Sequence, residues 1–323
     1  MSEFIEQVAD YSFSPTDLAV AGRRPGISAF MRIRNGAFSL EAAIRSHIHH
    51  FDEIVAVYNR CTDETPEILA RLAEEFRGRL RVWHYLPQVH PPGSSGHRST
   101  PADHPQSLVN YYNFALSRTR FTHVTKLDDD HVAMGDATAR LVADVRAGRA
   151  AQGEMACFSG VNLARDAAGQ VGLLASEPFS GSGDIGIFPV TPECRFVKDR
   201  RFEVLRLGLP RRFHSFVYWH LKYLKPDMGF GNYDLEQNPK SRYARRRAAL
   251  EAGPALLPLP ALAGLPLDWR ERLWGVGLPL PPRDQMLAAR RSAARQQAAA
   301  FRLDADAELA DFLSPDSAPA VRP

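Results

Sequence analysis

An apolar strand runs directly into three acids at Phe121-Thr122-His123-Val124-Thr125-Lys126-Leu127-Asp128-Asp129-Asp130. Before this segment, the hydrophobic pattern predicts strands at 27–31, 53–58 and 80–86, and helices at 38–50, from Asp63 or Thr65 onward, and at 106–117. Strands that alternate with helices predict an α/β fold, in which right-handed crossovers join the strands of a parallel sheet. After the acids we expect a helix at 136–147. Two strands follow at 154–163 and 171–175, joined by a turn at 166–169, so the sheet should become mixed.

The three acids carry the clearest chemical signal in the chain. Adjacent carboxylates repel one another strongly unless a cation lies among them. Alternation along the chain places Asp128 and Asp130 on one side and Asp129 on the other. Hard divalent cations prefer carboxylate oxygens and bridge readily to phosphates, and parallel sheets bind ligands beyond the carboxyl ends of their strands. The spacing therefore predicts a site for a metal and a nucleotide. The alternative is a solvated acidic turn that caps the helix beginning near Asp136.

Two earlier strand ends add to this pattern. The first predicted strand runs from Ile27 into Arg34-Asn35, and the second runs from Glu53 into Asn59-Arg60-Cys61-Thr62-Asp63-Glu64-Thr65. Together with Leu127-Asp128-Asp129-Asp130, these segments resemble glycosyltransferase family 2 and its relatives, over roughly residues 25 to 235. The resemblance implies the GT-A fold, a nucleotide-sugar donor, a Mn²⁺ or Mg²⁺ ion and a sugar-bearing acceptor.

The same resemblance suggests which residues bind the donor, although the motifs depart from the family pattern. The acid that binds the base in the family falls on Asn59, whose carbonyl accepts a hydrogen bond from uracil but whose amide also donates, so the base stays open. The family's Asn-Glu pair appears as Asn35-Gly36. The guanidinium forks of Arg32 and Arg34 match diphosphate oxygens, with a surface charge pair as the alternative. The expected donor-binding residues are Arg32, Arg34, Asn35, Asn59, Asp63, Asp128, Asp129, Lys222 and Lys225.

The metal ligands are expected at Asp128, Asp130 and His220. Other GT-A enzymes place a histidine on the metal and a nearby lysine on the diphosphate late in the fold, and His220-Leu221-Lys222-Tyr223-Leu224-Lys225-Pro226 resembles that arrangement. The alternative is a helix with His220 on its solvated face, and His214 is the rival ligand. The group His47, His49 and His50 is interpreted as a solvated helix end.

An inverting transferase needs a general base that deprotonates the acceptor hydroxyl. In the resembling family, an acid after a Gly-rich turn often has this role, and Gly181-Ser182-Gly183-Asp184 is such a turn here. Asp184 is therefore the first choice, because apolar residues follow it and partial desolvation would strengthen the base. Glu177, seven residues earlier, is the substitute. The alternative for Asp184 is a turn residue that bonds its own backbone.

Composition narrows the setting of the protein. The 323 residues carry a net charge of only +3, which does not suggest a nucleic-acid-binding protein. The three cysteines form no CxxC pair, and no apolar run reaches the ~20 residues that span a bilayer, so we expect a cytoplasmic protein. Arginines cluster at 242–247. They predict a solvated helix face or, alternatively, contact with anionic lipids at the inner face of the membrane or with a phosphate-bearing acceptor.

We therefore predict a GT-A-like glycosyltransferase domain at 1–250 and a Pro/Ala/Arg-rich extension at 251–323, with one helix at 285–301 and a disordered tail from Ser314. The predicted reaction moves a sugar from a nucleotide sugar to a glycan or lipid-linked acceptor, with inversion, in bacterial surface polysaccharide synthesis. A nucleotidyltransferase or an oxidoreductase would need a Gly-rich loop after the first strand, and Arg32-Ile33-Arg34-Asn35-Gly36 is not one. A non-catalytic glycan-binding protein is the alternative from another class. The sequence leaves the oligomeric state open.

Overall fold

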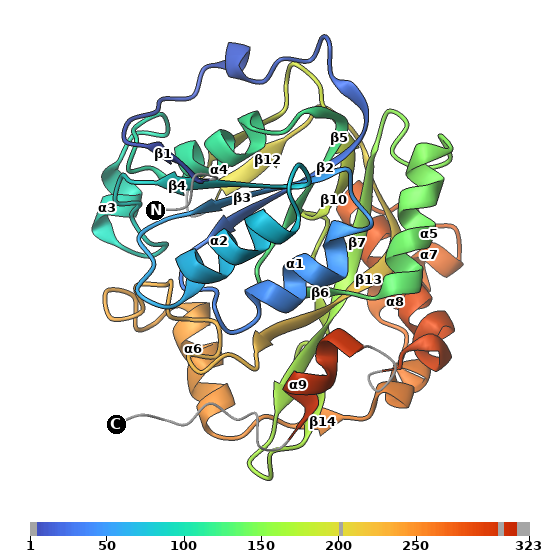
Figure 1. Ribbon diagram of the computed structural model, residues 1–323. Coiled ribbons are helices and arrows are strands. Elements are labelled where there is room, and N and C mark those ends of the chain that lie inside the picture. Colours follow the sequence, from blue (N-terminus) through green and yellow to red (C-terminus); the bar gives the residue numbers. More distant parts are fainter. Residues whose placement is uncertain (1–4, 200–202, 303–306, 315–323) are drawn as a thin grey trace. The chain divides into compact units, whose positions relative to one another are not determined.

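The computed structural model describes residues 5–199, 203–302 and 307–314. The chain forms two compact units. The first unit comprises residues 1–130, 189–208 and 230–248, and the second comprises 131–188, 209–229 and 249–323. Each unit is described by itself below, and Figure 1 gives the element labels used for both.

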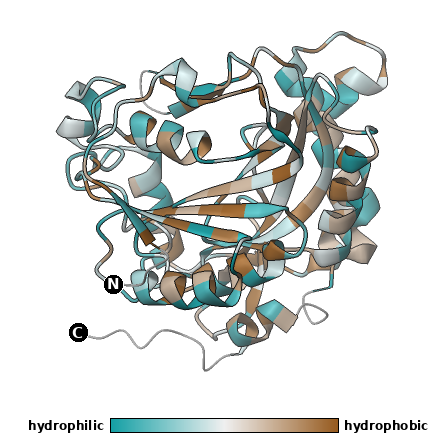
Figure 2. Ribbon diagram, turned by 45° about the horizontal axis from the view of Figure 1, so that its top comes forward, coloured by the Kyte–Doolittle hydropathy of each residue, from teal (hydrophilic) through white to brown (hydrophobic). Residues whose placement is uncertain are grey.

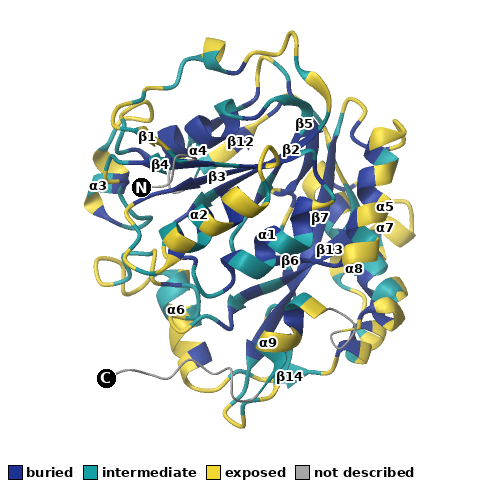
Figure 3. Ribbon diagram, viewed as in Figure 1, coloured by how far each residue is buried: buried dark blue, intermediate teal, exposed yellow. Residues whose placement is uncertain are grey.

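The first unit contains a parallel sheet, as the alternating pattern predicts. Its strands lie in the order β1 (Ile5–Val8), β4 (Leu80–Tyr85), β3 (Glu53–Tyr58), β2 (Arg24–Ile33) and β5 (Phe121–Leu127). Every residue of β3 is buried, as expected for a strand with neighbours on both edges and helices over the sheet. Figure 3 shows the same burial along the central strands. The α/β class with a mostly parallel sheet is thus confirmed.

Helices cover both faces of this sheet. The helices α1 (Leu40–Ile48) and α2 (Thr65–Glu75) lie on one face, while α4 (Leu108–Ser117) lies on the other (Figure 1). A two-stranded hairpin of β11 (Arg195–Lys198) and β12 (Glu203–Arg206) packs on α4. Further described elements of this unit are the 3-10 turn η1 (Pro15–Asp17), the short helix α3 (Ser95–Ser99) between β4 and α4, and α6 (Arg242–Glu251).

The apolar face of α1 confirms the predicted helix and corrects one side chain. Leu40, Ala43, Ile44 and Ile48 are buried, as the spacing predicts. His47 is buried as well, at 2% exposure, although a solvated position was predicted. Its Nδ1 lies 2.8 Å from the Ala43 carbonyl oxygen one turn earlier, and its ring stacks on Phe51. Burial lowers the pKa of His47 to about 4, so the imidazole is neutral in the folded protein.

The second unit has a mixed sheet. The long strands β7 (Met155–Arg165) and β13 (Arg211–Tyr223) are parallel neighbours, and β6 (His131–Ala133) pairs antiparallel with β13. Shorter antiparallel partners complete the sheet: β8 (Val171–Leu174), β9 (Phe179–Ser180), β10 (Gly186–Pro189) and β14 (Leu256–Leu257). The predicted turn between β7 and β8 is held by Asp166 Oδ1, which accepts hydrogen bonds from the Ala168 and Gln170 amides.

Helices of the second unit pack against β13. They include α5 (Gly135–Arg146) and the C-terminal α8 (Pro282–Gln297). The segment 251–323 was predicted to hold one helix, but it also carries α7 (Trp269–Gly275), α9 (Ala310–Leu313) and the 3-10 turns η2 (Leu259–Gly264), η3 (Ala298–Ala300) and η4 (Ala307–Leu309). It groups with 131–188 rather than forming a unit of its own, because Ala288, Ala294 and Phe301 are buried with the residues of β13. Of the tail predicted from Ser314, residues 315–323 lie outside the described residues.

Hydropathy follows these elements closely. Figure 2 shows apolar residues concentrated along the strands, while the helices alternate between apolar and polar residues. Within the described ranges, no helix combines the length and apolar character required to cross a membrane. The thiols of Cys61, Cys157 and Cys194 are all free, and the two later ones are buried.

Candidate metal centre and donor site

Three loops of the first unit meet at the carboxyl ends of their strands. In the register of the sheet, Ile33 of β2 lies beside Tyr58 of β3, and Met31 lies beside Leu127 of β5, so the three strands end together. Side chains then tie the loops to one another. Asn35 Oδ1 accepts from the Thr62 amide at 2.8 Å, and Asp63 Oδ2 accepts from the Ala37 amide at 2.9 Å. The segments that carry the sequence resemblance therefore lie together at the carboxyl ends of the parallel strands.

The acid triplet joins the same edge. The Ser39 hydroxyl donates to the Asp129 carbonyl oxygen at 2.8 Å. The Asp129 side chain packs against Gly36, where a Cβ atom would lie only 2.8 Å from the Asp129 Oδ2. Asp129 thus faces the turn after β2.

Asn59 has a structural position at this edge. Its side-chain amide donates to the carbonyl oxygens of Tyr85 and Pro87, at 2.6 and 2.7 Å, and its Oδ1 accepts from the Val89 amide at 3.4 Å. The side chain is buried and links the end of β3 to the segment after β4. Its contact with a nucleotide base stays a prediction, and in the structure its polar atoms bind the backbone.

Positive charge gathers on the α4 side of β2 and β5. The Arg32 guanidinium carbon lies 3.2 Å from the centroid of the Tyr112 ring, and the Lys126 ammonium lies 5.9 Å from the same ring. Lys126 also donates to both carboxylate oxygens of Asp128, at 2.8 and 2.7 Å. Burial opposes the charge on Lys126, but the Asp128 carboxylate outweighs it and raises the pKa of Lys126. The Arg34 carbonyl oxygen accepts from the Asn232 side chain, which places segment 230–235 over this edge.

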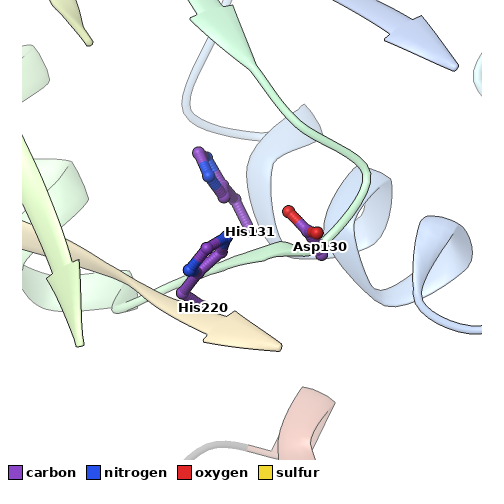
Figure 4. Close-up of side chains that lie close together, drawn as sticks. All are labelled: Asp130, His131 and His220. Carbon is purple, nitrogen blue, oxygen red and sulfur yellow. The ribbon is translucent and has the colours of Figure 1, made fainter. Parts of the chain in front are cut away.

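A second cluster begins where the triplet enters β6. Asp130, His131 and His220 each offer a ligand atom, and these atoms lie within 4.8 Å of one another (Figure 4). Strand pairing explains the contact, because His131 of β6 lies opposite His220 of β13 in the antiparallel register. Asp130 precedes His131 by one peptide bond. Asp130 and His131 are buried and His220 is half-buried, so the three groups form a partly enclosed site with the ligand types that divalent metals use.

This group brings together two of the three predicted ligands, and metal binding by them stays a prediction. Asp130 and His220 lie together, but Asp128 lies outside the group and faces Lys126. His131 is the third member of the group, and the D-x-D spacing of the acids gives no signal for it. The rival His214 lies six residues before His220 on β13, where its Nε2 is 3.0 Å from Glu154 Oε1. The helix considered for residues 220–226 is wrong, since β13 extends through Tyr223.

Neighbouring side chains orient both imidazoles. The Asn162 side-chain amide donates to the Glu177 carbonyl oxygen, so Asn162 Oδ1 faces His220 Nδ1, at 2.5 Å. Because the Asn162 oxygen can only accept a hydrogen bond, the neutral His220 ring carries its hydrogen on Nδ1. The ring lone pair that could bind a metal is then on Nε2. His131 stacks on Tyr218 with ring centroids 3.8 Å apart, and the hydroxyls of Tyr218 and Ser180 are 2.8 Å apart.

The two candidates for the general base, Glu177 and Asp184, lie beside different parts of β7. The Glu177 backbone binds Asn162, and its Oε2 accepts from the Tyr223 hydroxyl at 2.8 Å. Asp184 lies two residues before Gly186, which is opposite Cys157. Cys157 is five residues before Asn162, about 17 Å along a strand. Asp184 is also exposed, and its Oδ1 accepts from the Ser182 amide. Asp184 thus bonds its own turn, as the alternative interpretation expects, and the choice between Asp184 and Glu177 as the base stays a prediction.

The two predicted lysines follow His220 at the end of β13. Lys222 is half-buried, and its aliphatic stem packs so closely on Gly229 that a Cβ there would lie 2.2 Å from the Lys222 Cγ. Gly229 has a φ of 71°, a conformation that favours glycine and bends the chain around the lysine. Lys225 lies in the turn after the strand, where its amide donates to the Lys222 carbonyl oxygen. Their contact with a diphosphate stays a prediction.

Comparisons with known proteins give structural matches only. No family model and no curated protein matches the sequence. The solved structures that match include glucosyl-3-phosphoglycerate synthase from Mycobacterium tuberculosis in complex with Mn²⁺, uridine diphosphate and phosphoglyceric acid. It is 16% identical, over 53% of this chain and 54% of that one, with a TM-score of 0.29. The chain thus spans about half the length of that synthase. S. aureus TarS 1–349 is 13% identical, over 88% of this chain and 77% of that one, with a TM-score of 0.32.

Proposed function

We propose that this chain is a GT-A-like glycosyltransferase that uses a nucleotide-sugar donor and a divalent metal ion, Mn²⁺ or Mg²⁺. The observation that carries the proposal is the junction at Asp128–Asp130. The acids follow a parallel strand, share a sheet edge with the loops after β2 and β3, and lead into a partly enclosed Asp-His-His group. Carboxylate and imidazole ligands beside cationic side chains suit a metal bound together with a diphosphate.

Asp130, His131 and His220 would hold the ion in this account. When bound, the ion supplies positive charge to the diphosphate leaving group. The Arg32 guanidinium presents a planar fork of donors for phosphate oxygens, and it stacks on the Tyr112 ring. Lys222 and Lys225 remain candidates for the same diphosphate, and the Lys126–Asp128 pair fixes the strand end beneath it.

Glu177 is the general base in this account. One of its carboxylate oxygens accepts from Tyr223, which fixes the orientation of the group. The carboxylate removes the proton of the acceptor hydroxyl as the acceptor oxygen forms its bond to the anomeric carbon. The bond from that carbon to the diphosphate oxygen breaks, and the nucleoside diphosphate leaves with the electron pair. A direct displacement of this kind inverts the anomeric configuration.

The acceptor is proposed to be a glycan or a lipid-linked sugar of a bacterial surface polysaccharide, used at the cytoplasmic face of the membrane. The supporting feature is an exposed apolar surface on and beside α7, formed by Leu267, Trp269, Trp274, Val276 and Leu278. Nearby acids are in ion pairs with arginines, while Arg272 and Arg283 are exposed. Tryptophan beside exposed arginine suits an anionic lipid surface. Co-sedimentation with anionic vesicles should fall for Trp269→Ser/Trp274→Ser, and unchanged binding would contradict this part.

The proposed function is tested by thermal shift with a panel of nucleoside diphosphates, each with and without Mn²⁺. A ligand that binds only the folded state raises its stability. We expect at least one nucleotide to stabilise the protein in a Mn²⁺-dependent way, and Asp130→Ala to remove that dependence. Equal stabilisation of both proteins would show that the triplet is a helix cap. Asp136→Ala, at the exposed first turn of α5, is the matched control.

A further inference from the structure

We infer that His131 makes this centre selective for Mn²⁺ and later divalent transition ions over Mg²⁺. The inference deepens the proposed function, because it concerns the same metal centre. It follows from the ligand types: two of the three groups are imidazoles, and the carboxylate is Asp130 alone. Mg²⁺ prefers oxygen ligands in near-ideal octahedral geometry and gives up its water reluctantly, whereas imidazole suits transition ions better.

The strands fix the spacing of the two imidazoles. His131 and His220 are directly opposite residues of the β6–β13 pair, and their ring centroids lie 5.3 Å apart at an interplanar angle of 74°. Opposite residues of an antiparallel pair keep their separation because backbone hydrogen bonds hold both strands. A pair of nitrogen ligands is therefore built into the sheet rather than assembled by a flexible loop.

Each ring is also held by a neighbour that does not belong to the ligand group. Tyr218 lies flat against His131, and Gly160 leaves the space for it, since a Cβ at Gly160 would lie 2.1 Å from the Tyr218 ring. Asn162 fixes the hydrogen of His220 on Nδ1 and so directs the Nε2 lone pair to a metal. Asn162 is a positioning residue, and side chains of this kind typically change metal affinity by about 10- to 100-fold when replaced.

The test uses Mn²⁺ and Mg²⁺ alone, in calorimetric titrations of the full chain, together with pulsed electron paramagnetic resonance of bound Mn²⁺. We expect tighter binding of Mn²⁺ than of Mg²⁺, with ¹⁴N coupling from imidazole. His131→Asp should weaken that coupling and move the Mn²⁺/Mg²⁺ preference toward Mg²⁺ by about tenfold or more. Asn162→Leu should weaken Mn²⁺ binding, while His214→Ala, at the Glu154 end of β13, should leave it unchanged.

Equal affinity for the two ions, or bound Mn²⁺ without ¹⁴N coupling in the wild type, would overturn the inference. The wild-type measurements decide the matter even if His131→Asp fails to fold, which a far-ultraviolet circular dichroism spectrum reveals. The outcome also separates the two proposals. Nitrogen-coupled Mn²⁺ in a protein that neither binds a nucleotide sugar nor cleaves it would leave the metal inference standing and remove the glycosyltransferase.

Discussion

His220 and Asn162 form the link that connects the proposed metal ligands to the backbone of the proposed base, Glu177. Nδ1 of His220 lies 2.5 Å from the Asn162 oxygen, and the Asn162 amide donates to the Glu177 carbonyl oxygen at 2.8 Å. A proposed ligand, its positioning residue and the backbone of Glu177 therefore lie in sequence across β13, β7 and the segment before β9. This arrangement favours Glu177 over Asp184, although the Gly-rich turn made Asp184 the better candidate by sequence.

Replacing Glu177 by Gln should lower the turnover number by about 10²–10⁴-fold, the usual effect of losing a general base. Donor affinity should change little, since the proposed role concerns the acceptor. Asp184→Asn, in the same segment but exposed, is the matched control and should turn over at nearly the wild-type rate. Steady-state kinetics of both variants decide between them, and the reverse pattern would restore Asp184 as the base.

Replacing Arg32 by Lys should raise the KM for the donor by about tenfold, the equivalent of one lost charge-assisted hydrogen bond. The charge is kept, but the planar fork and its stacking on Tyr112 are lost. Arg24→Lys, at the exposed start of the same strand, is the control. An unchanged KM in Arg32→Lys would mean that Arg32 only packs against Tyr112.

Replacing Gly160 by Ala should destabilise the protein by about 1–3 kcal/mol, the range for overpacking a buried site. The added Cβ would meet the Tyr218 ring, and displacing that ring would also weaken Mn²⁺ binding through His131. Gly264→Ala adds the same methyl group where no atom lies within 4 Å, and should be nearly neutral. Urea unfolding and Mn²⁺ titration measure the two effects, and equal results for the two variants would contradict the packing account.

The free energy of unfolding should depend on pH through His47. Its pKa is about 4 when folded, because of burial, and 6.5 in the unfolded chain. Between these values the unfolded state binds more protons, so stability is complete above about pH 6.5 and falls as the pH drops toward 4, by about 3 kcal/mol in total. Urea unfolding of wild type and His47→Gln across this window isolates the effect, because other groups cancel. Parallel curves for the two proteins would show that His47 does not titrate in this way.

The sequence predicted the first unit well because its signals are local. The apolar strands and the buried face of α1 follow from hydrophobic spacing, and the three strand ends meet because parallel strands end at one edge. The metal group was predicted only in part. His131 approaches His220 through pairing of strands almost 90 residues apart, and no local pattern in His220-Leu221-Lys222 distinguishes a strand end from a helix. The position of Glu177 likewise depends on the register of β7 with its partners.

The central claim is tested most directly by nucleoside diphosphate release from a panel of nucleotide sugars, with wild type and Asp130→Ala, with and without Mn²⁺. The account predicts release from at least one donor by the wild type only when Mn²⁺ is present. It also predicts that Asp130→Ala, with its fold intact by circular dichroism, loses that release. Release that needs no metal, or that persists unchanged in Asp130→Ala, would contradict a catalytic metal held by Asp130, His131 and His220.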